Sequence, residues 1–171
     1  MNQSKALYES YSGERGFFNR EAADKIIESH GRRETGHKWG CNPCSEIILR
    51  PSEFCNLSEV IVRSDDRLED LLHKVDAATI FGTLQSTLTD FRYLRKIWKD
   101  NCEEERLLGV SLTGIMDHPV LNGSEGDEKL TEWLTTMREH SIAVNKKWAK
   151  QLKIPASVAI TCVKPSGTVS Q

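Results

Sequence analysis

Stretches with helical patterning alternate with short apolar runs along this chain of 171 residues, and this alternation limits its possible folds. Apolar residues recur at helical spacing in three stretches: 20–30, 66–98 and 128–152. Three short apolar runs bounded by polar or turn residues predict strands: 47–49, 57–62 and 157–163. We expect Gly31 to end the first helix and Gly82 to divide the second stretch into two helices. The pattern predicts an α/β fold in a single unit, residues 1–171, with no internal repeat or second domain.

One block combines an amide, a thiol and a carboxylate at alternate positions: Gly40-Cys41-Asn42-Pro43-Cys44-Ser45-Glu46-Ile47-Ile48-Leu49. In an extended strand, alternate side chains point to the same face, so we expect Asn42, Cys44 and Glu46 to lie together. A further thiol, Cys55, follows eleven residues after Cys44. The block therefore predicts a reaction site for one small substrate.

Composition excludes several classes of partner. The formal net charge is -2, which gives no general attraction to nucleic acid or to anionic membranes. There is no N-terminal apolar run typical of a signal peptide, and no apolar stretch of about 18 residues that would span a bilayer, so we expect a cytoplasmic protein. The five cysteines are an odd number, which favours free or catalytic thiols over a disulfide framework.

The block around Cys44 resembles the catalytic subunit of ribonucleotide reductases, in which Asn-Pro-Cys-x-Glu forms the tip of a finger loop inside an α/β barrel. Together with Cys-Asn-Leu-Ser-Glu-Val at 55–60, it is most similar to the adenosylcobalamin-dependent (class II) ribonucleoside-triphosphate reductases. Three weaker or shorter blocks follow the family's order: 12–20, 108–114 and 164–170. The resemblance implies a partial barrel with the finger loop, a few strands and long flanking helices.

The resemblance also implies a role for each residue of the block. Cys44 matches the thiol that becomes a thiyl radical and abstracts the 3'-hydrogen of the ribose. Glu46 matches the base that takes the proton of the 3'-hydroxyl group, and Asn42 would orient the substrate hydroxyls and this carboxylate. Cys55 matches one of two thiols that deliver the reducing electrons and end as a disulfide. None of the other thiols stands where the family has the partner of Cys55.

The turn after the last predicted strand resembles the family's phosphate-binding turn. A glycine there lets the backbone approach an anion, and adjacent N-H groups and hydroxyls add donors. The expected substrate-binding residues are Pro165, Ser166, Gly167, Thr168 and Val169, with Ser45 from the first block.

The expected activity is the reduction of ribonucleoside triphosphates to deoxyribonucleotides by thiyl-radical chemistry, with adenosylcobalamin as cofactor and a thioredoxin-like protein as reductant. A catalytic subunit of this family is several times longer than 171 residues. We therefore expect a fragment of the catalytic barrel, inactive without a complementary polypeptide that holds most of the cofactor site.

Two alternatives remain at this stage. One is a fragment of a class I, di-iron-dependent ribonucleoside-diphosphate reductase, which shares the finger loop. The other is a non-catalytic zinc-binding or interaction module, because His37, Cys41, Cys44 and Cys55 could supply zinc ligands. Structural zinc sites usually have a second close pair of ligands, so we assign no metal. The acidic run 103–105 predicts the solvated start of a helix.

Overall fold

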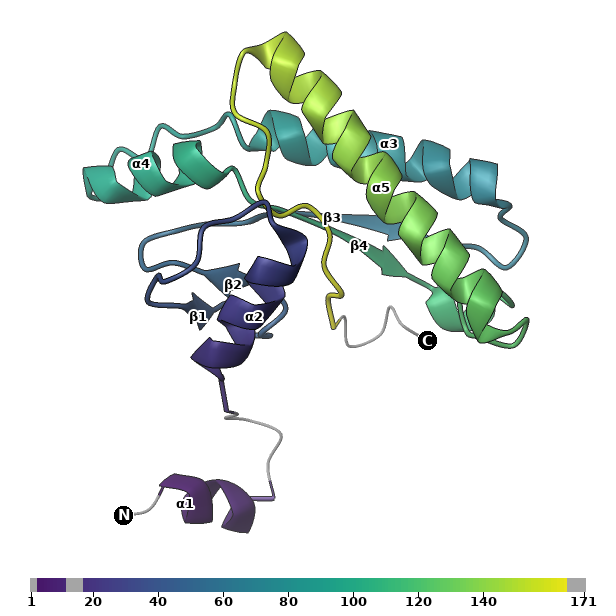
Figure 1. Cartoon of the computed structure of the whole chain (residues 1–171), viewed down its shortest axis with the longest axis horizontal. Coiled ribbons are helices and arrows are strands. Elements are labelled where there is room, and N and C mark those ends of the chain that lie inside the picture. The colour runs from purple at the N-terminus through teal and green to yellow at the C-terminus, as the bar shows by residue number, and fades with distance from the viewer. Residues whose placement is uncertain (1–2, 12–16, 166–171) are drawn as a thin grey trace.

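Two parallel strands, β3 (Asn56–Ile61) and β4 (Leu108–Thr113), form the centre of the molecule in a computed structural model that describes residues 3–11 and 17–165. Helices α3 (Leu68–Gln85) and α5 (Asp127–Leu152) pack together and lie over one side of this pair (Figure 1). The chain after α5 returns beside β4, where Val110 and Thr161 form a single parallel bridge. This arrangement confirms the predicted α/β class.

The remaining elements lie around this centre (Figure 1). The other side carries α2 (Arg20–His30) and a hairpin of β1 (Gly40–Cys41) and β2 (Ile48–Leu49). Helix α4 (Lys96–Glu105) leads directly into β4, and a 3-10 turn, η1 (Ile115–Asp117), follows β4. Helix α1 (Gln3–Glu9) lies away from the sheet (Figure 1).

The main core fills the space between the parallel strands and the two long helices. Its fully buried members include Leu71 of α3 and Leu108 of β4, which are at most 1% exposed. Burying an aliphatic side chain of this size stabilises a fold by roughly 1.5–3 kcal/mol. The remaining members of this cluster are Val60, Val62, Val75, Ala78, Val110, Leu121, Met137 and Ile160.

Both ends of α2 are set by capping residues in the local sequence. The Asn19 side chain accepts a hydrogen bond from the N-H of Ala22, which caps the first turn. Gly31 has φ 60° and terminates the helix in the left-handed conformation. The predicted helices over 20–30 and 128–152 are thus confirmed as α2 and α5.

The predictions for Gly82 and for the stretch 157–163 were wrong. Gly82 does not divide a helix, because α3 continues through it to Gln85. A Cβ atom on Gly82 would lie 3.3 Å from a methyl carbon of Leu108, so glycine allows α3 to approach β4 closely. The stretch 157–163 is not a regular strand, since it makes one bridge at Thr161 and Val163 is 84% exposed.

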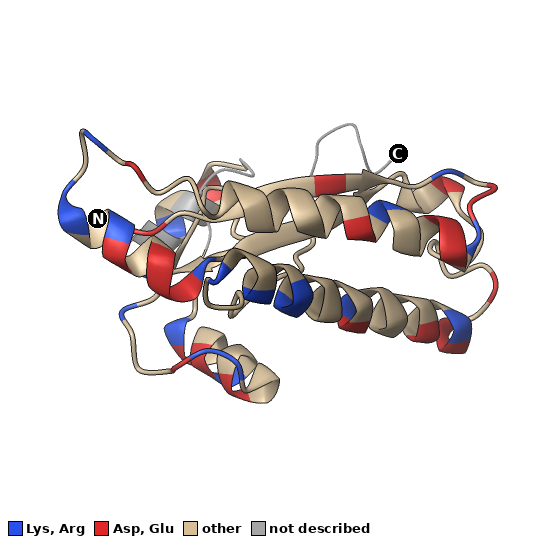
Figure 2. Cartoon of the chain, turned by 90° about the horizontal axis from the view of Figure 1, so that it is seen from above, with Lys and Arg blue, Asp and Glu red and all other residues tan. Residues whose placement is uncertain are grey.

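Basic and acidic residues are intermixed along several helices and loops (Figure 2). Among the residues that the structure describes, no helix is both long and apolar enough to cross a membrane.

Candidate functional site

The segment 42–47, called here the finger loop, closes the hairpin between β1 and β2. Cys41 pairs with Ile48 across the antiparallel strands. The Asn42 side-chain oxygen accepts a hydrogen bond of 3.1 Å from the N-H of Ile47, and Asn42 N-H donates to the Ile47 carbonyl at 3.4 Å. Asn42 therefore joins the two ends of the loop, a structural role that its position in the sequence did not reveal.

The finger loop is a tight turn, so the expectation of an extended strand was wrong. Ser45 has φ 64°, and its N-H donates to the Asn42 carbonyl at 3.0 Å. The chain reverses here, so strand alternation is not what brings Asn42 and Glu46 together, although the Asn42 amide does hydrogen-bond the Glu46 carboxyl group. Cys44 is exposed at the tip, whereas the Glu46 side chain is 2% exposed.

A cation from a distant part of the sequence reaches the carboxylate of the loop. Lys164 Nζ lies 3.3 Å from Glu46 Oε1. The pKa of Lys164 is raised, first by this hydrogen bond and then by the negative charges that Glu46 and the nearby Cys44 can carry. The N-H of Lys164 donates to Ser111 Oγ of β4 at 3.1 Å, which fixes the segment beside the sheet. Our site prediction omitted Lys164, although it begins the block at 164–170.

Glu46 is held in its charged form. Burial alone would raise the pKa of its carboxyl group, but hydrogen bonding from its own backbone N-H, from the Asn42 amide and from Lys164 lowers it below the ordinary value. An ionised carboxylate can accept a proton from a substrate hydroxyl group. The environment of Glu46 is therefore compatible with a general base.

Two half-buried thiols lie near the same carboxylate. Burial raises the pKa of Cys55, and the neighbouring Cys162 and Glu46 raise it further. Burial also raises the pKa of Cys162, to about 11. Cys162 Sγ lies 3.1 Å from the place that a Cβ atom on Gly109 would occupy, so the thiol packs over the bare backbone of β4. From the sequence we expect no role for Cys162, because such a cysteine is more often a small buried apolar group than a functional thiol.

A buried ionic cluster, formed by Arg33, Arg50, Glu53 and Glu105, fixes the hairpin to α4. Arg33 donates to Glu105 at 3.0 Å, to Glu53 at 3.1 Å and to the Ile48 carbonyl of β2 at 2.7 Å. The side chains of this cluster are at most 8% exposed. Burial raises the pKa of Glu53 to about 8, and a hydrogen bond with Glu105 adds to this effect.

The acidic run 103–105 was predicted wrongly. It forms the last turn of α4, not the start of a helix, and its final residue, Glu105, belongs to the buried ionic cluster. The partner arginines lie 55 and 72 positions earlier, so the sequence held no local indication of this pairing.

The zinc alternative receives no support from the geometry. Within 3–11 and 17–165, no three His, Cys, Asp or Glu side chains converge as metal ligands would. Cys41 Sγ contacts Ser45 Oγ at 3.4 Å instead, and the His37 ring packs edge-on against Trp39 at 5.1 Å.

Most of the predicted phosphate turn cannot be compared with the structure. Ser166, Gly167, Thr168 and Val169 lie outside the described residues, as do 12–16 of the first weak block. Pro165 is exposed, and Ser45 is exposed on the finger loop.

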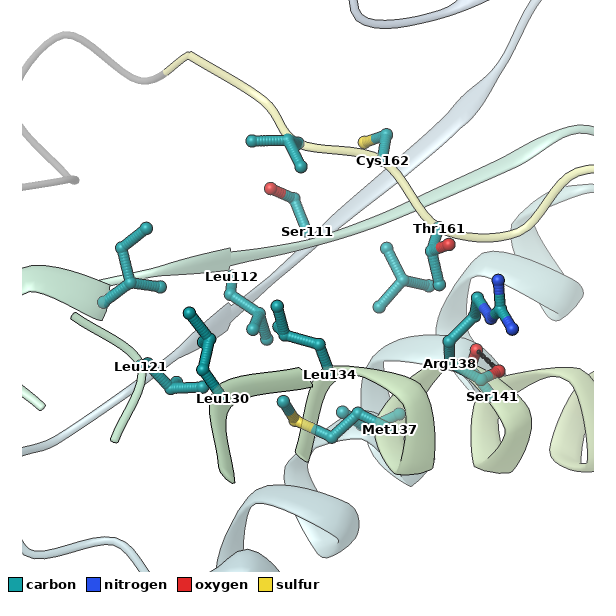
Figure 3. Close-up of a pocket in the computed structure, with 14 residues that line it drawn as sticks. Ser111, Leu112, Leu121, Leu130, Leu134, Met137, Arg138, Ser141, Thr161 and Cys162 are labelled. Carbon is teal, nitrogen blue, oxygen red and sulfur yellow. Dashed lines mark hydrogen bonds between the residues drawn. The ribbon is translucent and has the colours of Figure 1, made fainter. Parts of the chain in front are cut away.

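An apolar cavity of about 440 Å³ lies between α5, β4 and the 161–163 segment (Figure 3). Aliphatic side chains such as Leu130 and Leu134 line one end, whereas Arg138 and Ser141 lie at the other. Neither Cys44 nor Glu46 lines it, so this cavity is separate from the finger loop.

Comparisons with known proteins agree on one group of enzymes. The chain is 28% identical to a probable adenosylcobalamin-dependent ribonucleoside-triphosphate reductase of Dictyostelium discoideum, over 89% of this chain and 19% of that protein. It is 27% identical to the adenosylcobalamin-dependent ribonucleoside-triphosphate reductase of Lactobacillus acidophilus, over 94% of this chain and 25% of that protein. A putative enzyme of the same name from Mycobacterium phage D29 is 25% identical over 76% of this chain.

The structural comparison points the same way. A solved structure of a B12-dependent (class II) ribonucleotide reductase matches 84% of this chain and 22% of its own chain, with a TM-score of 0.60 and 22% sequence identity. This match shows the fold, which is that of part of the class II reductase. No family model matches the chain. The chain spans about a fifth to a quarter of the length of the proteins it matches.

Proposed function

We propose that this chain, which matches adenosylcobalamin-dependent ribonucleoside-triphosphate reductases over about nine tenths of its length, contributes the finger loop and adjoining strands to such an enzyme. The observation that most supports this proposal is the geometry of the finger loop. An exposed thiol at Cys44 is followed by a buried, charged carboxylate at Glu46, which Lys164 holds from the other end of the site. These relatives are cobalamin-dependent enzymes, and so do not favour the class I alternative.

The proposed chemistry assigns one step to each group. The Cys44 thiyl takes the 3'-hydrogen of the ribose while the Glu46 carboxylate accepts the proton of the 3'-hydroxyl group. The 2'-hydroxyl then leaves as water, and Cys55 with a second thiol supplies two electrons and two protons, ending as a disulfide. Glu46 then returns its proton to the 3' oxygen, and Cys44 returns the hydrogen atom to the 3' carbon. Asn42 holds the loop in the shape that presents the thiol and the carboxylate.

Adenosylcobalamin would supply the radical. The apolar cavity of about 440 Å³ does not suit a corrin ring beside the reacting thiol, since it is aliphatic over most of its wall and is not lined by the finger loop. We therefore assign the cofactor to parts of the reductase that the match does not cover, and derive no step through it. The exposed position of Cys44 leaves its thiol open to a radical source on that side.

The substrate class and the reductant are part of the same proposal. Ribonucleoside triphosphates would bind with their phosphates at the 165–169 turn beside Ser45, and a thioredoxin-like protein would reduce the disulfide that Cys55 forms. A complementary polypeptide would complete the barrel, and the chain alone would then show no turnover.

The test is deoxyribonucleotide formation under anaerobic conditions, with this chain, its complementary polypeptide, a ribonucleoside triphosphate and a dithiol, with and without adenosylcobalamin. We expect product only when the cobalamin is present, and none with Cys44→Ser. Cys41→Ser is the matched control, because Cys41 lies beside the loop and has no proposed role. A stable complex that forms no product, or a Cys44→Ser variant that retains activity, would refute the proposal.

A further inference from the structure

Two arginines without carboxylate partners line a cavity behind the finger loop. The cavity has a volume of about 150 Å³ and is bounded by α2, β2, the start of β4, the 158–161 segment and α5. Arg32, in the loop after α2, and Arg138 of α5 both belong to its wall. Neither of these two guanidinium groups makes an ion pair in the described part of the chain. By contrast, Arg33 in the same wall and Arg50 in the buried ionic cluster are both paired with carboxylates.

One donor of the Arg32 side chain lacks a hydrogen-bond acceptor at this cavity, in the part of the chain that the structure describes. Its Nε atom is buried and has no hydrogen-bond partner among the described residues. A buried donor without a partner destabilises the folded state. Burial lowers the pKa of Arg32, and the positive charge of Arg138 lowers it further, so the two cations are close enough to repel one another. An anion between them would relieve both costs.

Arg138 is placed so that it can contribute from the opposite wall. Its side chain rises from α5 towards Thr161, at the polar end of the neighbouring apolar cavity (Figure 3). It therefore stands where the two cavities meet, and the 150 Å³ space extends from there towards the finger loop. This volume is about five times that of one water molecule in the liquid, which is room for a tetrahedral oxyanion.

The other charged groups in the wall do not cancel the two arginines. Arg33 is neutralised by Glu53 and Glu105. Glu46 lies in the same wall; its Oε1 is paired with Lys164 at 3.3 Å, whereas its buried Oε2 has no hydrogen-bond partner among the described residues. His30 adds a further nitrogen that could donate. The unbalanced charge of the cavity is thus positive.

We propose that this cavity is a phosphate-binding subsite, in which Arg32 and Arg138 bind the oxygens of one phosphoryl group. Planar guanidinium groups suit phosphate because they donate two parallel hydrogen bonds. The subsite lies behind the finger loop and uses none of the residues of the 165–169 turn. It does not depend on the proposed reductase activity, since its occupation can be measured in the chain alone.

The test is isothermal titration of this chain with inorganic phosphate in a low-chloride buffer, repeated with acetate. We expect saturable binding of one phosphate, weakened at least about tenfold by Arg32→Gln and by Arg138→Gln, which is the loss of a charge-assisted hydrogen bond or more. Arg63→Gln is the control, because Arg63 is exposed, far from the cavity wall, and changes the net charge equally.

A thermal unfolding series gives a second readout. Without phosphate, Arg32→Gln should unfold at a temperature equal to or above that of the wild type, because an unpaired buried donor and a like-charge contact are removed. Phosphate should then raise the unfolding temperature of the wild type and of Arg63→Gln, but not that of Arg32→Gln. Equal phosphate binding by all variants, no binding by the wild type, or equally tight binding of acetate would overturn the proposal. The last result would assign the pair to a carboxylate.

Discussion

Replacing Arg33 by methionine tests whether the buried ionic cluster holds the hairpin in place. Methionine keeps much of the length of the arginine side chain but removes its donors to Glu53, Glu105 and the Ile48 carbonyl. The two carboxyl groups then remain buried with one cation fewer. We expect the free energy of unfolding to fall, because an uncompensated buried charge is costly.

The size of the effect follows from the geometry. Breaking a buried ion pair by removing one partner costs about 3–5 kcal/mol. The pKa of Glu53 is raised to about 8, so below that pH its carboxyl group is already neutral and Glu105 is the carboxylate that loses a partner. We therefore expect a value near the lower limit, roughly 3 kcal/mol. The loss should be larger above pH 8, where Glu53 is ionised as well as Glu105, than below it.

Urea titration followed by tryptophan fluorescence measures this difference, and Trp39 is a suitable reporter because the Arg33 guanidinium lies 4.5 Å from its ring centre. For a slope of about 1–3 kcal/mol per molar urea, a loss of 3 kcal/mol moves the midpoint by roughly 1–3 M. Arg67→Met is the matched control, because Arg67 pairs with Asp70 at the surface, with side chains 76% and 40% exposed. Such an exposed pair contributes little to stability, because water screens it. Equal losses in the two variants would refute our account of the cluster.

Three further predictions concern the backbone, the thiols and the pH dependence. Gly114→Ala should lower the free energy of unfolding more than Gly36→Ala does. Both glycines have positive φ, but only at Gly114 would the new Cβ atom meet a backbone oxygen, at 2.6 Å. We expect a loss of about 1–2 kcal/mol for Gly36→Ala and roughly 1–3 kcal/mol more for Gly114→Ala, measured by chemical denaturation. Iodoacetamide at pH 8 should alkylate the exposed Cys44 before Cys55, because burial raises the pKa of the Cys55 thiol. Peptide mass spectrometry after a short exposure to the reagent measures the order of labelling, and labelling of Cys55 first would contradict the prediction. The folded state holds a proton on Glu53 up to about pH 8, so stability should fall as the pH rises from about 5 to 8, and Glu53→Gln should flatten this slope in thermal denaturation at several pH values.

Local patterns predicted those features of the fold that depend on local interactions. The spacing of apolar residues gave α2 and α5 nearly to the residue, because amphipathic faces and the cap at Gly31 are properties of neighbouring positions. Gly82 was misjudged because its role is packing against Leu108, a residue 26 positions away, and not local flexibility. Helix propensity alone contains no information about such a contact.

The site was predicted in part for the same reason. The block 40–49 indicated where the thiol and the carboxylate lie in the chain, but the left-handed Ser45 turned an expected strand into a tight loop. Lys164 reaches Glu46 over 118 positions and Arg33 reaches Glu105 over 72, and neither separation leaves a pattern within a short window. Residues that recognise one another across the fold are found only once the sheet and helices are placed.

The link between Arg33 and Glu105 also has a consequence in time. During synthesis, the hairpin leaves the ribosome long before α4, because 72 positions separate the two partners. At about 5–20 residues per second, this delay is roughly 4–14 seconds. Through that interval the segment with Cys44 and Cys55 has no anchor, and its thiols are open to oxidants that the finished fold restricts at Cys55. Completion of α4 anchors the hairpin, whereas the low reactivity of Cys55 is established only when β4 and Cys162, which follow α4 in the chain, are in place.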